Sequence, residues 1–207
     1  MKNFLLTASA VLFAGAHLAT AQNQEIGLTL GRIHGPSRSS TNGSIDLGSG
    51  LALQANYGYR FFLSRNVALS GEVHFLANGL RDIHSAVPGA TRDVATIYVT
   101  PGLRLKFAPG RRFSPYVVGG GGYALYEQSF YRQDRLSNKA PRFTNRGVLA
   151  FGGGADIPVW KWIGARFEAR DFYSGNPSFN TPVIGSGQHN VVASGGFVLS
   201  FGGRREG

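Results

Sequence analysis

Apolar and polar residues alternate with a period of two along much of the chain, most clearly between residues 51 and 61. One face of this stretch is apolar and consists of Leu51, Leu53, Ala55, Tyr57, Tyr59 and Phe61. The other face is small or polar and consists of Ala52, Gln54, Asn56, Gly58 and Arg60. Successive side chains of a β-strand point to opposite faces of a sheet, so this pattern predicts a strand.

The same pattern recurs along the chain and predicts eight strands. They are placed at residues 25–32, 51–61, 67–75, 96–107, 113–126, 148–157, 163–171 and 191–201. The facing of 113–126 stays open, because the glycines from Gly119 to Gly122 have no side chain to mark a face. Pro101 lacks a backbone donor, so it marks either a bulge or a local weakening of its strand.

Short and long connections alternate between these strands. Three connections are short, near Ser64, Pro109 and Val159. Four are long and polar, at residues 35–48, 77–93, 127–146 and 173–188. Turns at one rim and loops at the other are typical of an all-β, up-and-down antiparallel barrel of eight strands.

Period two fits two kinds of barrel, which differ in the direction of the apolar face. A soluble, lipocalin-like ligand-binding barrel would turn Leu53, Tyr57 and Val99 inward, whereas a transmembrane barrel turns them toward lipid. The polar face here carries mostly Gly, Ala, Ser, Thr, Asn and Gln. Charged residues make up 15% of the chain, against about 25% in soluble domains. The sequence therefore favours the transmembrane barrel.

Aromatic residues gather beside the short turns, which supports the same interpretation. The set consists of Tyr57, Tyr59, Phe61, Phe107, Trp160 and Trp162. Membrane barrels carry such residues as girdles at the lipid–water interface. We expect an interfacial girdle here, with ordinary core aromatics as the alternative.

The N-terminal segment predicts export. Lys2 is followed by an apolar run over residues 4–16, and Ala19-Thr20-Ala21 offers small residues for cleavage. The run is too short to span a bilayer as a helix, although an uncleaved anchor is the alternative. We expect a signal peptide at residues 1–21, an outer-membrane barrel at 22–201 and a polar tail at 202–207. Both ends of the barrel would lie in the periplasm and the four long loops outside.

Several charged residues fall on the inward face of the predicted strands. The main set consists of Glu72, Arg104, Asp156, Arg166, Glu168 and Arg170. The lumen of an eight-stranded barrel is narrow and filled by side chains, and an unpaired charge there costs several kcal/mol. We expect a structural ion-pair network; a gated or proton-conducting interior is the alternative.

Positive charge is concentrated in one long loop. The formal net charge of the chain is +10, and loop 127–146 holds Arg132, Arg135, Lys139, Arg142 and Arg146 with aromatic residues between them. An exported protein meets anionic lipopolysaccharide more readily than nucleic acid. The sequence therefore predicts contact with lipopolysaccharide or another polyanion and no contact with nucleic acid. A mobile, solvated loop is the alternative.

The residues needed for catalysis or metal binding form no recognisable motif. There is no cysteine, and the histidines are scattered. A lipid-modifying hydrolase of the outer membrane would need His34, His84 or His189 to meet a serine such as Ser37 or Ser85 and an acid at the loop rim. We expect no enzyme, metal or cofactor, with such a hydrolase as the alternative.

The chain resembles the OmpA-like and OmpX-like small outer-membrane barrels. The resemblance rests on residues 115–123, 152–156, Arg166-x-Glu168-x-Arg170 and Phe197-x-Leu199-x-Phe201. It implies a structural or surface-interaction barrel, expected here as a monomer and inserted by the outer-membrane assembly machinery. That machinery reads a terminal strand ending in an aromatic residue, here Phe197, Leu199 and Phe201. Six residues follow Phe201, so the signal is displaced from the chain end.

Overall fold

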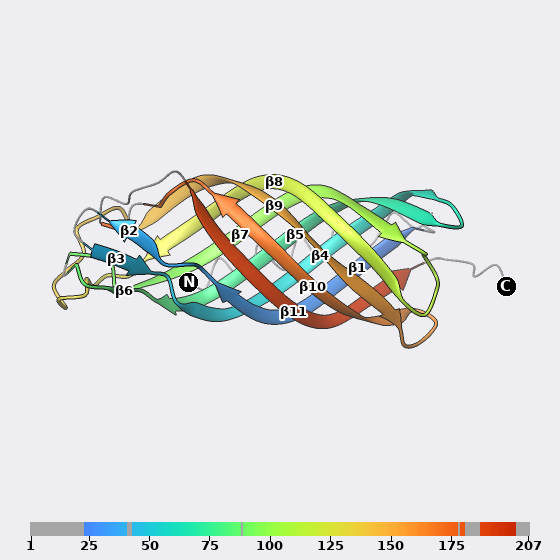
Figure 1. Cartoon of the computed structure of the whole chain (residues 1–207), viewed down its shortest axis with the longest axis horizontal. Helices are drawn as coiled ribbons and strands as arrows, with labels where there is room; N and C mark the ends of the chain where they lie inside the picture. The colour runs from blue at the N-terminus through green and yellow to red at the C-terminus, as the bar shows by residue number, and fades with distance from the viewer. Residues whose placement is uncertain (1–22, 41–42, 88, 178, 181–186, 202–207) are drawn as a thin grey trace, which may run out of the picture.

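Eight long antiparallel strands form a closed barrel in the computed structural model of the chain, which describes residues 23–40, 43–87, 89–177, 179–180 and 187–201 (Figure 1). The strands are β1 (Gln24–His34), β4 (Ser49–Leu63), β5 (Val67–Asp82), β7 (Asp93–Phe107), β8 (Ser114–Gln128), β9 (Phe143–Pro158), β10 (Ile163–Ser174) and β11 (Gln188–Phe201). Their order around the barrel is β1-β11-β10-β9-β8-β7-β5-β4. The predicted eight-stranded up-and-down barrel is confirmed. The signal peptide and the polar tail lie outside the described residues and stay predictions.

Strands extend past their predicted ends on the side of the long connections. β5 continues seven residues beyond the predicted end at Phe75, and β9 begins at Phe143 rather than at Val148. Backbone pairing continues there, as in the pair of Asn78 with Thr96. The outward positions of these extensions need not be apolar, so the alternation that revealed the strands fades.

Three short strands lie beyond the loop rim. They are β2 (Arg38–Ser40), β3 (Gly43–Asp46) and β6 (His84–Ser85), and they form a small sheet in the order β2-β3-β6 (Figure 1, left). This sheet joins the first long connection to the second. Strands of two to four residues are too short to show a period, so the sequence indicated only loops.

The stagger of the strands sets the width of the lumen. The paired residues can be followed once around the barrel from Gln24 through Tyr59, Gly71, Leu103, Gly119, Phe151, Asp171 and Val191 to His34. The path ends ten residues further along β1 than it began. Eight strands with this stagger tilt by about 40° and leave an interior just wide enough for side chains.

The apolar face points outward. Leu53, Tyr57 and Val99 are 56%, 43% and 41% exposed, so the soluble lipocalin-like alternative is wrong. The structure also settles the facing of β8, where Tyr116 and Tyr126 are buried inside while Val117 and Tyr123 are exposed outside. No helix among the described residues is long and apolar enough to cross a membrane.

Pro101 weakens its strand without causing a bulge. β7 stays in one register with β8 on both sides of it, from Val99 paired with Tyr123 to Gly102 paired with Gly120. The two residues between them have no partner on β8. Because Pro101 cannot donate a backbone hydrogen bond, the pairing is interrupted only locally.

The backbone of β8 passes close to that of β7 at one glycine of its glycine run, and this close approach can be tested. A Cβ at Gly120 would lie 2.3 Å from the Pro101 carbonyl oxygen, whereas a Cβ at Gly119 would meet open space. We expect Gly120→Ala to lower the free energy of unfolding by about 1–3 kcal/mol, because the two strands must move apart. Gly119→Ala, the matched control, should change it by less than about 0.5 kcal/mol. Urea unfolding in detergent, followed by tryptophan fluorescence, measures both; equal effects would contradict the packing.

Candidate functional site: the filled lumen and the loop rim

A network of ion pairs fills the half of the lumen nearer the turns. The Arg166 guanidinium donates from Nε and Nη2 to the two carboxylate oxygens of Asp156, at 2.7 and 2.8 Å. Nη2 also lies 2.9 Å from Glu25 Oε1. Lys106 Nζ reaches Glu25 at 3.0 Å and Asp156 at 2.7 Å. These charges lie on β1, β7, β9 and β10, so the network ties opposite walls of the barrel together.

A second group of charges continues the network toward the middle of the barrel. Arg170 donates from Nε and Nη2 to the Glu168 carboxylate, at 2.6 and 2.9 Å, and from Nη2 to Glu72 at 2.5 Å. Arg104 pairs with both Glu25 and Glu72 and thereby links the two groups. The Tyr116 hydroxyl donates to Glu168 at 2.7 Å, and its ring packs 4.7 Å from the Arg104 guanidinium.

The structure brings together all six charged residues that the sequence placed inside the lumen. It adds Glu25 and Lys106, whose inward positions in the alternation were the available signal. Four carboxylates face four cations, so the network is neutral overall. Such a lumen is packed with paired charges rather than open.

An apolar layer closes the lumen above this network. The Tyr98 and Phe172 rings stack at 4.7 Å, and the Tyr98 hydroxyl lies 3.1 Å from that of Tyr126. Phe179, from the last long connection, packs edge-on against Tyr126 at 6.1 Å. The other large members of the layer are Ile33, Ile45, Leu47, Leu76 and Ile83. Ile45, Leu47, Ile83 and Phe179 lie in the connections, where no period marks a core residue, so sequence reasoning missed this cap.

Loop 127–146 is held in place and keeps part of its positive charge free. Arg132 pairs with Asp134 at 2.6 Å. Arg142 pairs with Glu127 and lies 4.0 Å above the Phe130 ring. Arg146 Nε donates to the carbonyl of Asn176 at 2.9 Å. The remaining two cations of the set, Arg135 and Lys139, are exposed and have no ion-pair partner in the part of the chain that the structure describes.

Contacts with the second long connection fix this loop. The Gln133 backbone N–H donates to the carbonyl of Ala90 at 2.9 Å, and its side-chain Nε2 donates to the carbonyl of Thr91 at 3.1 Å. Within the loop, the Asn138 side chain donates to the carbonyl of Ser129 at 3.0 Å. The bonds of Gln133 tie the loop to the second long connection, and polyanion contact by the loop's cations stays a prediction.

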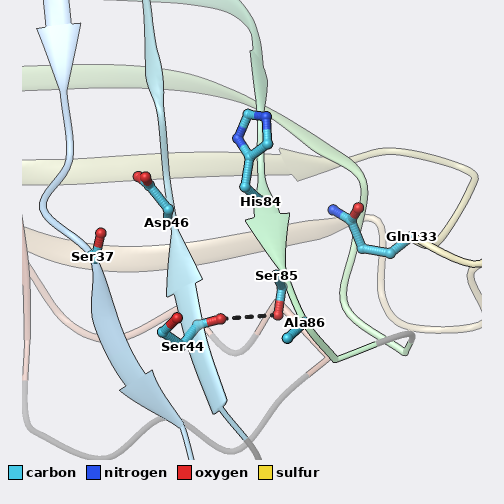
Figure 2. A pocket seen from close by; sticks show the side chains of 7 residues that line it. All are labelled: Ser37, Ser44, Asp46, His84, Ser85, Ala86 and Gln133. Carbon is cyan, nitrogen blue, oxygen red and sulfur yellow. Dashed lines mark hydrogen bonds between the residues drawn. The ribbon is translucent and has the colours of Figure 1, made fainter.

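One shallow pocket at the loop rim gathers the residue types of a hydrolase. Its volume is about 440 Å³, and Ser37, Asp46, His84 and Ser85 line it (Figure 2). Asp46 accepts from the Gly48 backbone at 2.8 Å, and the Ser85 hydroxyl donates to the carbonyl of Ser44 at 3.2 Å. Within the described residues, no hydrogen bond joins His84 to a serine or to the acid. The pocket therefore lacks the linked serine, histidine and acid of a triad.

The other two histidines predicted at the loop rim form separate pairs. His34 Nδ1 lies 3.1 Å from Ser49 Oγ, and His189 Nδ1 lies 2.6 Å from Asp171 Oδ2. Each pair holds two of the three groups that a serine hydrolase requires. The interpretation that the chain is not an enzyme stays a prediction.

Comparison with known proteins places the barrel in a family. The sequence model of the outer membrane protein beta-barrel domain matches residues 4–201. This chain belongs to the outer membrane protein beta-barrel family. It is therefore a transmembrane barrel of the Gram-negative outer membrane. A comparison with curated protein sequences found no match.

Solved structures of other outer-membrane barrels share the fold of this family member. Neisserial surface protein A is 14% identical with a TM-score of 0.54, over 86% of this chain and 97% of that one. OprG from Pseudomonas aeruginosa is 15% identical with a TM-score of 0.54, over 87% and 96%. AlkL is 15% identical with a TM-score of 0.51, over 88% and 92%. At these identities the likeness shows the fold alone.

The outer wall of this membrane barrel is apolar and ends in aromatic residues at the turns. The six residues predicted as a girdle are all exposed on the outside, with Trp160 at 68% and Trp162 at 56%. The terminal strand also presents Phe197 and Phe201 outward, and Phe201 pairs with Gln24 where β11 meets β1. Recognition of this strand by the assembly machinery stays a prediction.

The buried charges predict a strong coupling between Glu168 and Arg170. Arg170→Gln should lower the free energy of unfolding by about 3–5 kcal/mol, because it leaves Glu168 and part of Glu72 uncompensated. The double variant Glu168→Gln/Arg170→Gln should cost less than the sum of the two single variants, because both charges are gone. Urea unfolding of the four proteins in detergent measures the coupling. Strict additivity would show that the two side chains do not interact.

Proposed function

We propose that this barrel is a surface-contact protein whose loop rim binds the phosphates of lipopolysaccharide or a similar polyanion. The observation that carries the proposal is the free positive charge of Arg135 and Lys139 on a loop held by hydrogen bonds. Outer-membrane barrels of this kind have short periplasmic turns and longer extracellular loops. This loop would then face lipopolysaccharide.

Exposed aromatic and apolar side chains accompany these cations. Phe130, Tyr131, Leu136 and Phe143 are between 55% and 61% exposed. Amphipathic aromatic rings are favoured at the membrane interface, and guanidinium and ammonium groups attract phosphate. Together they suit a surface that meets both the sugar-phosphate region and the upper edge of the lipid.

The neutrality of the ion-pair network strengthens this assignment. Paired charges cancel inside the barrel, so the network contributes nothing to the formal net charge of +10. The positive excess must act mainly outside the network, where it attracts anions over about 8 Å at physiological ionic strength. A filled lumen also supports a role as a scaffold rather than as a general pore.

Removing the two free cations should weaken polyanion binding. We expect Arg135→Gln/Lys139→Gln to lower the affinity of the detergent-solubilised barrel for lipopolysaccharide by about twofold to thirtyfold, since each exposed contact contributes only about 0.2–1 kcal/mol. The loss should shrink as salt rises, because screening weakens the two contacts that the wild-type protein makes and the variant lacks. Isothermal titration with lipopolysaccharide at two salt concentrations measures it.

The matched control removes the same amount of positive charge at the rim formed by the short turns. Arg111 and Arg112 lie in the short turn between β7 and β8 and are exposed. Arg111→Gln/Arg112→Gln therefore lowers the net charge equally without touching the loops. If both double variants lost the same affinity, binding would follow net charge, and the loop would not be the site.

A further inference from the structure

Arg81 is a buried lumen arginine that no carboxylate neutralises among the described residues. It lies near the loop end of β5 and is 1% exposed. Its Nη1 donates to Asn190 Oδ1 at 2.9 Å. Its Nε and Nη2 are buried and have no hydrogen-bond partner. Leaving a guanidinium so placed is costly, because it has lost water and gained only one neutral acceptor.

Two other buried arginines of the lumen, Arg166 and Arg170, show what the Nε and Nη2 donors of a guanidinium can bind together. Arg166 uses Nε and Nη2 to grip both oxygens of Asp156, and Arg170 uses the same two atoms on Glu168. The two donors lie parallel and match the two oxygens of one oxyanion. In Arg81 the same pair of donors is buried and unpaired.

Other unpaired polar atoms belong to residues at neighbouring positions of the sheet. Asn78 Oδ1, Thr96 Oγ1 and Gln128 Oε1 are buried without hydrogen-bond partners. The strand register brings them together, since Arg81 pairs with Val94, Val94 pairs with Gln128, and Asn78 pairs with Thr96. The group lies on the inner wall of β5, β7 and β8 at the level of the apolar cap. Native proteins rarely leave so many neighbouring polar groups unsatisfied unless water or an ion occupies the site.

We propose that Arg81 binds a small oxyanion inside the lumen, at the level of the apolar cap. Two oxygens of the anion would accept hydrogen bonds from Nε and Nη2, and its charge would neutralise the guanidinium. An oxyanion that also carries a hydroxyl, such as hydrogencarbonate or dihydrogen phosphate, would donate to the amide oxygen of Asn78 or Gln128 as well. This site is separate from the exposed loop surface of the proposed function and does not depend on it.

Anion-dependent stability tests the site. The purified barrel is refolded in a zwitterionic detergent with increasing sodium formate, hydrogencarbonate or phosphate, and with sodium chloride at matched ionic strength. We expect the urea midpoint of the wild-type barrel to rise and saturate with the oxyanions, because a ligand that binds only the folded state stabilises it. The midpoint of Arg81→Met should show no saturating rise.

Two further variants separate a bound anion from general salt effects and from misfolding. Arg111→Met removes an arginine at the turn rim and should respond like the wild-type protein. Arg81→Lys keeps the charge but loses the two parallel donors. It should therefore need an oxyanion concentration at least tenfold higher than the wild type for the same rise in the urea midpoint. In buffer without oxyanion, Arg81→Met should unfold at a higher urea concentration than the wild type, because a buried uncompensated charge is gone.

Direct detection completes the test. Carbon-13 NMR of labelled formate should show line broadening with the wild-type barrel that is absent with Arg81→Met. If the wild-type, Arg81→Met and Arg111→Met proteins respond alike to every salt, Arg81 is satisfied by water alone and the proposal is wrong.

Discussion

Complete pairing of the backbone in lipid is the constraint on which this structure depends. A lipid-exposed N–H or C=O has no water to bind, so a sheet can cross the membrane only if it closes on itself. Here the closure is the pairing of β1 with β11, which runs without interruption from Gln24 with Phe201 to His34 with Val191. The stagger of the strands follows from this closure, and the narrow lumen follows from the stagger.

The narrow lumen in turn dictates the chemistry of the inner face. Every second side chain of each strand points into a lumen that is filled by side chains. The charged groups among them must therefore pair with one another. Arg104 shows the consequence, because it joins the lower group at Glu25 to the middle group at Glu72. The network connects strands that are far apart around the barrel. The ion pairs therefore brace the barrel across its diameter, in directions where backbone hydrogen bonds do not act.

The sequence predicted the parts of the protein that repeat and missed the parts that do not. Alternation between Leu51 and Phe61 revealed a strand and its facing, because lipid on one side and a packed lumen on the other impose period two. The same alternation placed the side chains of Arg166, Glu168 and Arg170 inside the lumen. The alternation could also have placed Glu25 in the lumen. Ile45 and Phe179 could not, because their burial depends on how distant connections fold over the rim, which no local pattern records.

The barrel wall and the long connections at its rim differ in how freely their sequences can vary. Neisserial surface protein A and OprG share this fold at 14% and 15% identity, so the barrel fold itself tolerates wide sequence variation. The apolar cap is different, because it joins the barrel to three of the long connections and fixes the loops above it. Loop 127–146, which carries Arg135 and Lys139, is held in turn by hydrogen bonds from Gln133 to Ala90 and Thr91 of the second connection. A rigid loop loses less conformational entropy on binding than a mobile one, so this anchoring would favour the polyanion contact proposed for the loop.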